Sequence, residues 1–504
     1  MDVSPRYEAF AETFEAGAPQ VVWTKLAADL ETPVSAMLKL GAGRPNSFLL
    51  ESVEGGAIRG RYSIIGLEPD LIWRCRGAKA EINRRVLNDP DAFEPCRQDS
   101  LSELRALVKG ARIDLPEDLP PMAAGLVGYI GYDMVRLMER IPDANPDNMG
   151  LFDSLFLRPT IMAIFDNVDN SVTVVTPVWR ETREDARKAY GRARTRLASA
   201  TTRLERALPQ SHERAPEGGE IPEPASNTSR EAYHRMVKAA KEYIAAGEIF
   251  QVVASQRFHV PFRLPPFALY RALRRLNPSP FLFFLDFGDF AVVGSSPEIL
   301  VRLRDGEVTI RPIAGTRRRG ANRAEDAALA KDLLSDPKEL AEHLMLLDLG
   351  RNDVGRVAKI GTVHVTEKMA IEYYSHVMHI VSNVAGEIDP RYDAIDALIG
   401  GFPAGTVSGA PKVRAMEIID ELECERRGIY GGAVGYFAAN GTMDTCIALR
   451  TAIVKDGKMY IQAGGGIVAD SDPEAEYQES CNKAMALIRA AQEAVRFAAG
   501  NGNH

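Results

Sequence analysis

Runs of strand-forming residues follow one another along this chain with no helix between them. Thr160 to Asp166 is followed, after a turn at Asn167 to Asn170, by Ser171 to Val178. Phe281 to Phe287 is followed almost at once by Phe290 to Val293. A doubly wound parallel sheet would alternate strands with helices, so this order favours large antiparallel sheets packed with helices. The sequence therefore predicts an α+β fold.

The clearest break in composition lies at residues 209–229, where prolines fall among Gly, Ser, Glu and Asn with few apolar residues. Such a stretch is typical of a loop or linker. We therefore expect an N-terminal regulatory or structural region at 1–208 and a second domain at 230–500. Further strand-like runs cover residues 47–50, 61–65, 70–74, 308–312 and 459–463, and helical patterns cover 183–208, 336–350 and 472–496.

Bulk properties exclude several classes of function. The formal net charge of −8 argues against broad contact with nucleic acid or an anionic membrane, but not against a small anionic ligand. The N-terminus shows no secretory signal, and no run of about 18 apolar residues predicts a membrane span. The five cysteines are scattered and odd in number, which favours reduced thiols in the cytoplasm over disulfides or a zinc site.

Two Glu-x-x-Glu pairs each open a predicted helix. Glu339 and Glu342 follow an Asp-Pro step, and Glu476 and Glu479 follow another. Residues three apart share a helix face, so each pair can direct two carboxylates at one point. Carboxylate oxygens from two helices would suit Mg²⁺. A single such pair is more often a solvated helix face, and Glu479 could instead form an ion pair with Lys483.

Three further features suggest a site for an anionic substrate. Gly464 to Gly466 ends a predicted strand, where bare backbone could approach a ligand or simply form a turn. Arg450 lies in an apolar, strand-like run, and a buried guanidinium needs a partner such as a substrate carboxylate or a structural Asp. His379 lies in a similar run, where a lone His is more often a satisfied core residue than a catalyst.

Together these motifs resemble the chorismate-utilising enzymes, and among them the large, aminating subunits of anthranilate synthases. The matching segments cover most of the chain; they include residues 49–52, 128–133, 247–253, 294–298, 312–316, 348–353 and 405–412. The resemblance implies the two-lobed chorismate-utilising enzyme fold, with residues 230–500 as the chorismate-binding catalytic domain. It also implies a Mg²⁺-dependent lyase that converts chorismate and ammonia to anthranilate and pyruvate, the first step of tryptophan biosynthesis.

The resemblance also assigns roles to particular residues. It implies that Glu298 is the acid that protonates the departing C4 hydroxyl, and that His379 assists the later loss of pyruvate. A hydroxide ion is a poor leaving group, so an acid at C4 is chemically necessary. The implied magnesium ligands are Glu339, Glu342, Glu476 and Glu479. The implied substrate-binding and remaining catalytic positions are Arg450, Tyr430, Gly464, Gly465, Gly466, Ala314, Gly315, Thr316, Lys483, Thr406 and Gln251.

Two positions separate this chain from other branches of the family. Isochorismate-forming relatives carry a Lys base where this chain has Gln251, and aminodeoxychorismate synthases typically carry a nucleophilic Lys in place of Ala314. Neither residue here can do that chemistry, which favours direct attack of ammonia on C2. The alternatives that remain are an aminodeoxychorismate synthase without that Lys, and a non-catalytic regulator that binds chorismate or tryptophan.

The resemblance implies a partner and an inhibitor as well. No glutaminase module is visible in the sequence, so ammonia is expected from a separate glutamine amidotransferase subunit. Large subunits of this family often bind tryptophan as a feedback inhibitor. The matching positions are Glu51, Ser52, Asn277, Pro280, Phe281 and Leu282. Residues 277–283 could equally be a plain turn into a core strand.

Overall fold

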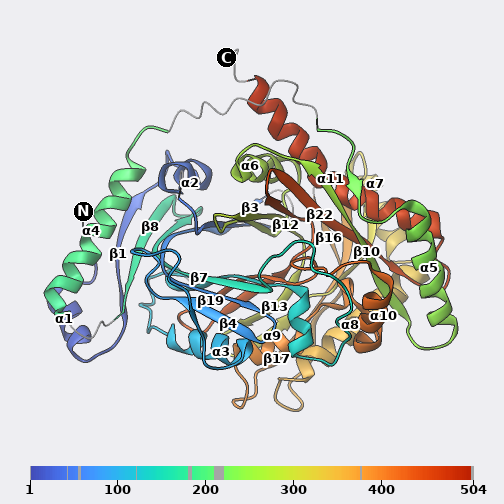
Figure 1. The fold of residues 1–504 in the computed structure, drawn as a ribbon, viewed down its shortest axis with the longest axis horizontal. Coiled ribbons are helices and arrows are strands. Elements are labelled where there is room, and N and C mark those ends of the chain that lie inside the picture. The colour runs from blue at the N-terminus through green and yellow to red at the C-terminus, as the bar shows by residue number, and fades with distance from the viewer. Residues whose placement is uncertain are drawn as a thin grey trace.

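The strands of this protein are all antiparallel to their neighbours. The computed structural model describes residues 2–41, 44–54, 58–120, 122–179, 184–208, 221–374 and 377–500. Within these ranges 22 strands join into one continuous hydrogen-bonded sheet, and each ladder between named strands is antiparallel. Helices cover the outside of this sheet (Figure 1). The predicted α+β fold with large antiparallel sheets is confirmed.

The sheet divides into two arms from a pair of long strands, β3 (Ile58–Arg76) and β7 (Ser154–Asp166). The first arm runs from β3 through β2 (Ser47–Glu54), β11 (Phe281–Asp286), β12 (Phe290–Ser296), β21 (Thr451–Lys455), β22 (Lys458–Ile467) and β10 (Gln251–Pro261). The second arm runs from β7 through β6 (Gly125–Ile130), β19 (Ala433–Ala438), β20 (Met443–Ile447), β13 (Ile299–Arg304), β14 (Glu307–Ile310) and β17 (Val377–Glu387).

Other strands extend this framework. β15 (Ile313–Arg318) and β16 (His364–Tyr373) both pair with β17. β8 (Ser171–Val178) pairs with β7 and carries β1 (Gln20–Ala27) at the edge. The remaining strands are β4 (Lys79–Asn83) and β5 (Glu94–Pro95) beside β3, and β9 (Ala225–Ser226) and β18 (Gly409–Ala410) beside β10.

An apolar core lies between the two arms, and helices pack on their outer faces. Phe283 of β11 and Val292 of β12 point inward to meet Val434 of β19 and Cys446 of β20. Because side chains alternate along a strand, Phe284 points the other way, toward the helices. Helices against the first arm are α2 (Pro33–Gly41), α6 (Pro266–Leu276) and α11 (Pro473–Gly500), whereas α1 (Tyr7–Glu15) and α4 (Ala186–Leu204) pack beside β1 and β8.

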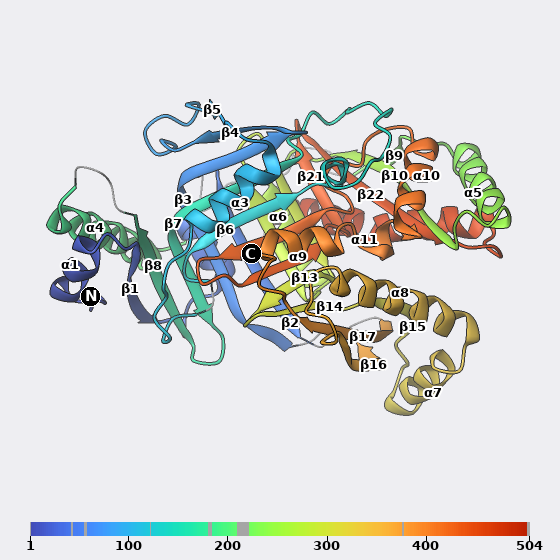
Figure 2. The same cartoon turned by 90° about the horizontal axis from the view of Figure 1, so that it is seen from below.

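The second arm and the far end of the first have their own helices. α3 (Ser100–Gly110), α8 (Pro337–Gly355) and α9 (Ala394–Gly401) cover the second arm, and α5 (Arg230–Ala245) and α10 (Lys412–Leu422) pack on β10. α7 (Arg323–Leu333) packs beside β15 and β17. Seen from below, α7 and α8 lie alongside β15, β16 and β17 (Figure 2). Among the described helices, none is long and apolar enough to cross a membrane.

Both helices that carry the Glu-x-x-Glu pairs begin where the sequence predicts. Asp336 caps α8 by accepting hydrogen bonds from the backbone N–H groups of Lys338 and Glu339, with Pro337 as the first helical residue. Asp472 does the same at α11 for Glu474 and Ala475. These caps satisfy N–H groups that have no partner inside the helix.

Several predicted boundaries were wrong. The runs at 61–65 and 70–74 belong to the single strand β3, which stays paired with β7 across an irregularity between Pro69 and Leu71. The three glycines lie inside β22 rather than after it. Residue 183 and residues 209–220 lie outside the described ranges, and β9 and the cap of α5 occupy part of the predicted linker. The division into two functional regions stays a prediction, although β2 pairs with β11 and β6 with β19 across it.

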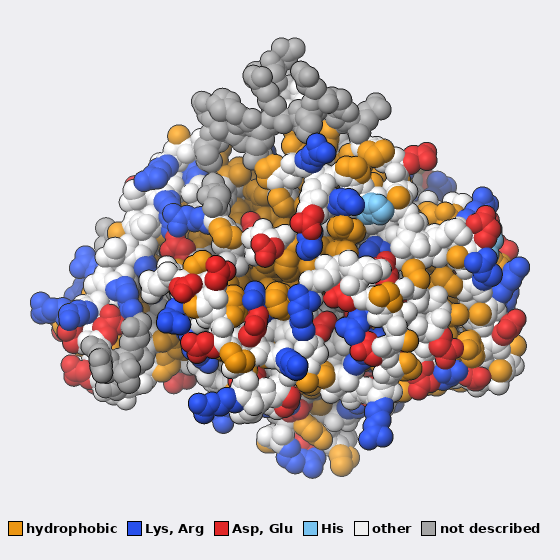
Figure 3. Space-filling view, in the orientation of Figure 1, with side chains coloured by type: hydrophobic (Ala, Val, Ile, Leu, Met, Phe, Trp, Pro, Cys, Tyr) orange, Lys and Arg blue, Asp and Glu red, His pale blue; other side chains and the backbone are white. Residues whose placement is uncertain are grey.

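The surface is mixed in charge. Acidic and basic side chains are interspersed over the face shown in Figure 3, and apolar side chains gather in a hollow near its upper middle.

The core between the arms depends on aromatic rings that lie over glycines. Phe48 is fully buried on β2 opposite Gly66 of β3, where an added Cβ would lie 2.1 Å from the ring. Phe48→Ala should therefore lower the free energy of unfolding by about 3–5 kcal/mol, since it removes buried apolar surface and leaves a cavity. Denaturant unfolding measures this, with Leu30→Ala, at a residue 91% exposed, as the control. Equal effects of the two substitutions would contradict this account of the core.

Candidate active site

Glu298 lies in the turn between β12 and β13, with its carboxyl group buried. The hydroxyl of Thr406, from the short helix η2 (Gly405–Val407), donates a 3.3 Å hydrogen bond to Glu298 Oε1. Burial raises the pKa of Glu298 to about 8, because desolvation disfavours the charged form more than the Thr406 hydrogen bond favours it. The carboxyl group therefore keeps its proton at neutral pH, as a general acid must.

His379 lies on β17, also buried, with its ring 5.2 Å from that of Tyr374. Its Nδ1 is 3.0 Å from Thr316 Oγ1 and 3.2 Å from the carbonyl oxygen of Gly315. Burial, with the nearby Arg450 charge, lowers the pKa of His379 to about 4. A carbonyl can only accept, so Nδ1 carries the proton and Nε2 keeps a lone pair. The ring is thus set up to accept a proton.

Arg450 lies in a turn between β20 and β21 at a positive φ of 50°, and not inside a strand as predicted. It is half-buried, and within the described ranges no acidic side chain comes within ion-pair distance of it. Burial lowers its pKa, opposed by the charges of Tyr374 and Glu298. A guanidinium in such surroundings attracts an anion.

The glycine segment lies where a side chain has no room. A Cβ on Gly465 would lie 2.8 Å from Glu476 Oε2, and one on Gly466 would lie 2.1 Å from the amide nitrogen of Gln251. Gly464 stands opposite Ser255 in the ladder with β10, and Lys483 Nζ donates to its carbonyl oxygen at 2.9 Å. This part of β22 therefore carries no side chains, and the side chains of Glu476 and Gln251 lie directly against its backbone.

Tyr430 and Gln251 are buried near the glycines. Burial raises the pKa of the Tyr430 hydroxyl to about 12, against the lowering effect of a backbone hydrogen bond from Gly464, so the hydroxyl stays protonated. Gln251 opens β10, and its Oε1 is buried without a hydrogen-bond partner in the described part of the chain. A buried amide oxygen without a donor is costly unless a ligand supplies one.

On the opposite side, β15 bulges at Gly315, which adopts a φ of 80° between Ala314 and Thr316. A Cβ there would lie 3.2 Å from Glu339 Oε2, so the bulge lets the backbone pass between Glu339 and His379. The structure thus brings Glu339, a candidate metal ligand of α8, beside the candidate catalytic histidine.

The two carboxylate pairs approach one another but do not form a finished metal site. Among the described residues, no three His, Cys, Asp or Glu side chains are grouped closely enough to bind a metal ion. Glu339 is paired with Arg317 at 3.0 Å, and Glu479 with Lys483 at 2.7 Å. The second distance confirms the alternative that Glu479 forms an ion pair with Lys483.

Two of the four carboxylates nevertheless have oxygen atoms to offer. Glu342 makes no hydrogen bond or ion pair within the described ranges, and its pKa is raised by burial and by the charges of Glu339 and Glu479. Glu476 accepts from Ser471 at 2.7 Å, while its Oε2 is buried without a partner in the described structure. A bound cation would reduce the repulsion between these carboxylates and would give the unpaired oxygen a partner. The residues therefore fit a hard metal ion.

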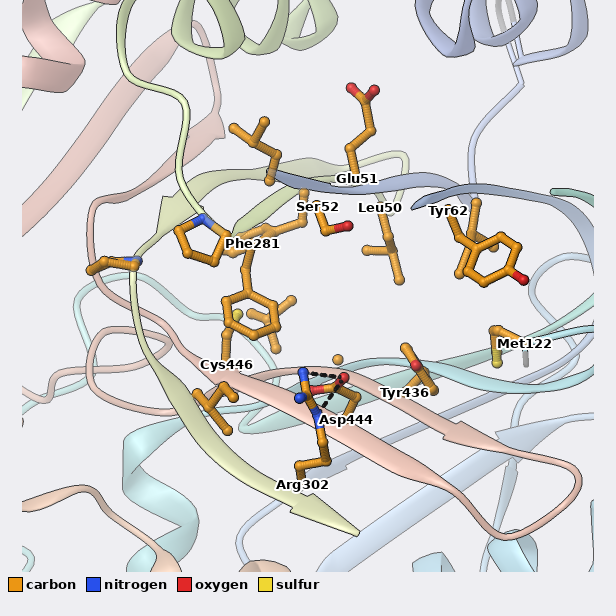
Figure 4. A pocket seen from close by; sticks show the side chains of 18 of the residues that line it. Leu50, Glu51, Ser52, Tyr62, Met122, Phe281, Arg302, Tyr436, Asp444 and Cys446 are labelled. Carbon is orange, nitrogen blue, oxygen red and sulfur yellow. Dashed lines mark hydrogen bonds and ion pairs between the residues drawn. The ribbon is translucent and has the colours of Figure 1, made fainter. Parts of the chain in front are cut away.

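A second site is a cavity of 670 Å³ between the arms of the sheet (Figure 4). Phe281, Tyr436 and Cys446 line it, and Arg302 and Asp444 form an ion pair of 2.9 Å at its floor. Asp444 Oδ1 is buried with no partner in the described residues. The last four of these residues were not predicted from the sequence, because nothing in β13, β19 or β20 distinguishes them from ordinary core positions.

The positions predicted for tryptophan fall unevenly around this cavity. Ser52, Pro280, Phe281 and Leu282 line it. Glu51 borders it, but its carboxylate points away (Figure 4). The remaining predicted position, Asn277, is not among the lining residues.

Glu51 is already neutralised inside the protein. Arg274 donates two hydrogen bonds to its carboxylate, at 2.6 and 2.9 Å, and the hydroxyl of Tyr270 donates another. The carboxylate therefore has little capacity left for the ammonium group of a ligand.

The cavity and the candidate catalytic residues share a wall. Pro297 and Ile299 line the cavity, whereas Glu298 between them contacts Thr406 on the other side. Tyr374 also lines the cavity while its ring packs against His379.

Comparison with known proteins places this geometry in a family. The family model described as chorismate binding enzyme matches residues 60–489. Anthranilate synthase component 1 of Cereibacter sphaeroides is 62% identical, over 98% of this chain and 99% of that protein. Anthranilate synthase component 1 of Pseudomonas aeruginosa is 51% identical, over 92% and 93%.

Solved structures agree. Anthranilate synthase component I from Streptococcus pneumoniae superimposes with a TM-score of 0.74 at 37% identity, covering 85% of this chain and 92% of that one. The menaquinone-specific isochorismate synthase from Escherichia coli gives a TM-score of 0.70 at 19% identity, covering 97% and 100%, which shows a shared fold.

The raised pKa of Glu298 predicts a pH dependence of stability. In the unfolded chain this carboxyl group ionises near pH 4.5, whereas the folded protein holds the proton to about pH 8. Between these values the unfolded state binds fewer protons, so this group lowers stability as pH rises through that window. Glu298→Gln should therefore be more stable than the parent protein at pH 8, with a smaller difference at pH 4.5. Thermal unfolding across this range measures it; an equal difference at both pH values would contradict the raised pKa.

Proposed function

Because the chain belongs to the chorismate binding enzyme family, we propose that it is a lyase that forms anthranilate and pyruvate from chorismate and ammonia. This reaction would be the first step of tryptophan biosynthesis. The proposal rests on a buried, protonated Glu298 that lies near a neutral His379 and near Arg450, for which the described residues provide no acidic partner. Acid, anion-binding group and base are the parts that this conversion of a dicarboxylate needs.

Arg450 would bind a carboxylate of chorismate through two parallel N–H bonds, with the Tyr430 hydroxyl as a further donor. The bare backbone at Gly464, Gly465 and Gly466 would let the substrate lie against β22. Residues along the opposite wall would complete the pocket; they are Ala314, Gly315, Thr316 and, from α11, Lys483.

Ammonia would attack C2 of the ring while the double bonds shift and the C4–O bond breaks. Glu298 would protonate the departing hydroxyl, which leaves as water, with Thr406 holding the carboxyl group in place. His379 would then take the C2 proton on Nε2 as the enolpyruvyl C–O bond breaks. Pyruvate leaves as its enolate and takes up a proton at the methylene carbon, which balances the proton that the C2 ammonium group releases, and the ring becomes aromatic.

Mg²⁺ is the cofactor we propose, held by Glu339 and Glu342 of α8 with Glu476 and Glu479 of α11. When bound, it would neutralise a carboxylate of chorismate and fix its orientation. Glu476 Oε2 and the Glu342 carboxylate, neither of which has a partner among the described residues, support this assignment.

Two residues favour ammonia over water or a covalent intermediate. Gln251 has no basic group that could activate water, but its unpaired Oε1 can accept a hydrogen bond from ammonia. Ala314 carries no nucleophile. An aminodeoxychorismate synthase remains the second candidate within the family, and a non-catalytic regulator would have no use for a desolvated acid.

The word component in the relatives' names supports a partner for this chain. We propose a separate glutamine amidotransferase subunit that supplies ammonia, with no role for nucleic acid or membrane. We also propose a reducing cytoplasm as the location; in the described structure all five cysteines are free thiols.

The cavity between the arms is the proposed site of feedback inhibition by tryptophan. Phe281, Tyr436 and Cys446 offer apolar contacts for an indole ring. Asp444 pairs with Arg302 through Oδ2, and its Oδ1, which has no partner among the described residues, is the acceptor that we propose for the ammonium group in place of Glu51.

Product analysis tests the reaction. The chain with chorismate, Mg²⁺ and ammonium should yield fluorescent anthranilate, whereas glutamine alone should yield none. Glu298→Gln should reduce turnover by at least about 10²-fold while chorismate still binds, since general acid catalysis contributes about that much. Formation of aminodeoxychorismate or isochorismate instead, or full turnover by Glu298→Gln, would overturn the proposal.

Tryptophan should inhibit the ammonia-dependent reaction, and Tyr436→Ala should weaken this inhibition by removing a contact surface in the cavity. Asn277→Ala is the matched control, because Asn277 does not line the cavity. Inhibition constants for both variants are compared in the same assay. If Asn277→Ala lost inhibition while Tyr436→Ala was inhibited as strongly as the parent protein, the inhibitor would bind elsewhere.

A further inference from the structure

Arg317 on β15 gathers three carboxylates from outside its strand. Its Nε is 2.8 Å from Asp332, its Nη2 is 2.7 Å from Asp336 and its Nη1 is 3.0 Å from Glu339. Nη1 also donates to the carbonyl oxygen of its neighbour Thr316, at 3.0 Å. The guanidinium thus binds the end of α7, the cap of α8 and the first proposed metal ligand at once.

This contact joins two parts of the proposed catalytic machinery. Thr316 pairs with His379 in the ladder between β15 and β17, and Arg317 is the next residue along the strand. Glu339 lies one turn into α8, beside the Gly315 bulge. Arg317 therefore fixes the distance between the strand at the catalytic histidine and the helix that supplies the metal ligands.

The other carboxylate pair has an equivalent cation. Lys483 binds Glu479 at 2.7 Å and the Gly464 carbonyl oxygen at 2.9 Å. Each pair of glutamates thus has one member held by a cation of the chain and one, Glu342 or Glu476, with free oxygen capacity. This arrangement accounts for the absence of a finished metal cluster among the described residues.

We propose that Arg317 is a positioning residue that holds Glu339 in the metal-free protein and yields this carboxylate to the metal by exchange. The inference rests on the proposed Mg²⁺ site. Exchange is inexpensive, because Arg317 keeps Asp332 and Asp336 when Glu339 turns away. Meanwhile the guanidinium offsets repulsion between Glu339 and Glu342, and it competes with the cation for the same oxygen atoms.

Replacing Arg317 should therefore have two opposite effects. Arg317→Gln removes the competitor and a positive charge, so Mn²⁺, used as a paramagnetic substitute for Mg²⁺, should bind about three- to tenfold more tightly without chorismate. The metal-free protein should melt at a lower temperature, because three carboxylates lose their shared counter-ion. A residue that only supports the fold would lower the melting temperature without tightening metal binding.

Electron paramagnetic resonance of free Mn²⁺ gives the dissociation constant, and thermal unfolding gives the second readout. Arg318→Gln is the matched control: Arg318 is the next residue, its side chain is 78% exposed, and Glu325 is its one ion-pair partner in the described part of the chain, so its substitution should change neither quantity. Arg317→Lys keeps the charge without the planar fork and should fall between the parent and Arg317→Gln. If Arg317→Gln does not fold, Mn²⁺ binding by Arg317→Lys tests the proposal instead.

If the parent protein binds Mn²⁺ but the Arg317 variants bind it no more tightly, the proposed exchange is wrong and the proposed metal site still stands. Failure of the parent protein to bind Mn²⁺, or equal binding by Glu342→Gln, would overturn the metal site and the exchange together. The reaction itself is judged separately, by its product.

Discussion

The alternation of side chains at the start of β13 is the constraint that places the candidate catalytic site and the cavity on opposite sides of one segment. Glu298 and its neighbours Pro297 and Ile299 lie at the boundary between two spaces, and consecutive residues of an extended chain point to opposite sides. One side holds Thr406, Arg450 and the candidate catalytic chemistry; the other is the cavity between the arms. Any ligand that moves Pro297 or Ile299 must also move the acid between them.

The chemistry on the first side follows from removal of water. Desolvation keeps a proton on Glu298 and keeps His379 neutral, so an acid and a base coexist at one pH. The same burial leaves Arg450 charged but without an acidic partner among the described residues, a state that a carboxylate substrate relieves. The carboxylates of α8 and α11 differ from these groups, because ion pairs with Arg317 and Lys483 neutralise part of their charge.

The sequence predicts the local features of this site well. The two Asp-Pro caps and the carboxylate pairs behind them depend on contacts within four residues, and α8 and α11 begin as expected. Arg450 was misplaced, because an apolar run does not reveal that the chain turns at a positive φ inside it. β3 was divided in two, since its continuity depends on pairing with β7 about 90 residues away.

The cavity was the least predictable part. Glu51 was expected to face a ligand, but Arg274, more than 200 residues away in sequence, binds its carboxylate. Tyr436 and Cys446 come together with Phe281 only because β11 and β19 belong to opposite arms. Such contacts depend on register across the whole sheet, which no local pattern encodes.

The most direct test of the central claim is the protonation state of Glu298 itself. Infrared difference spectra between the parent protein and Glu298→Gln isolate the carboxyl band of this one residue across a pH titration. The account predicts a protonated carboxyl band at pH 7 that disappears at about pH 8, because the side chain is desolvated. A band already lost near pH 4.5, the ordinary value for Glu, would contradict it.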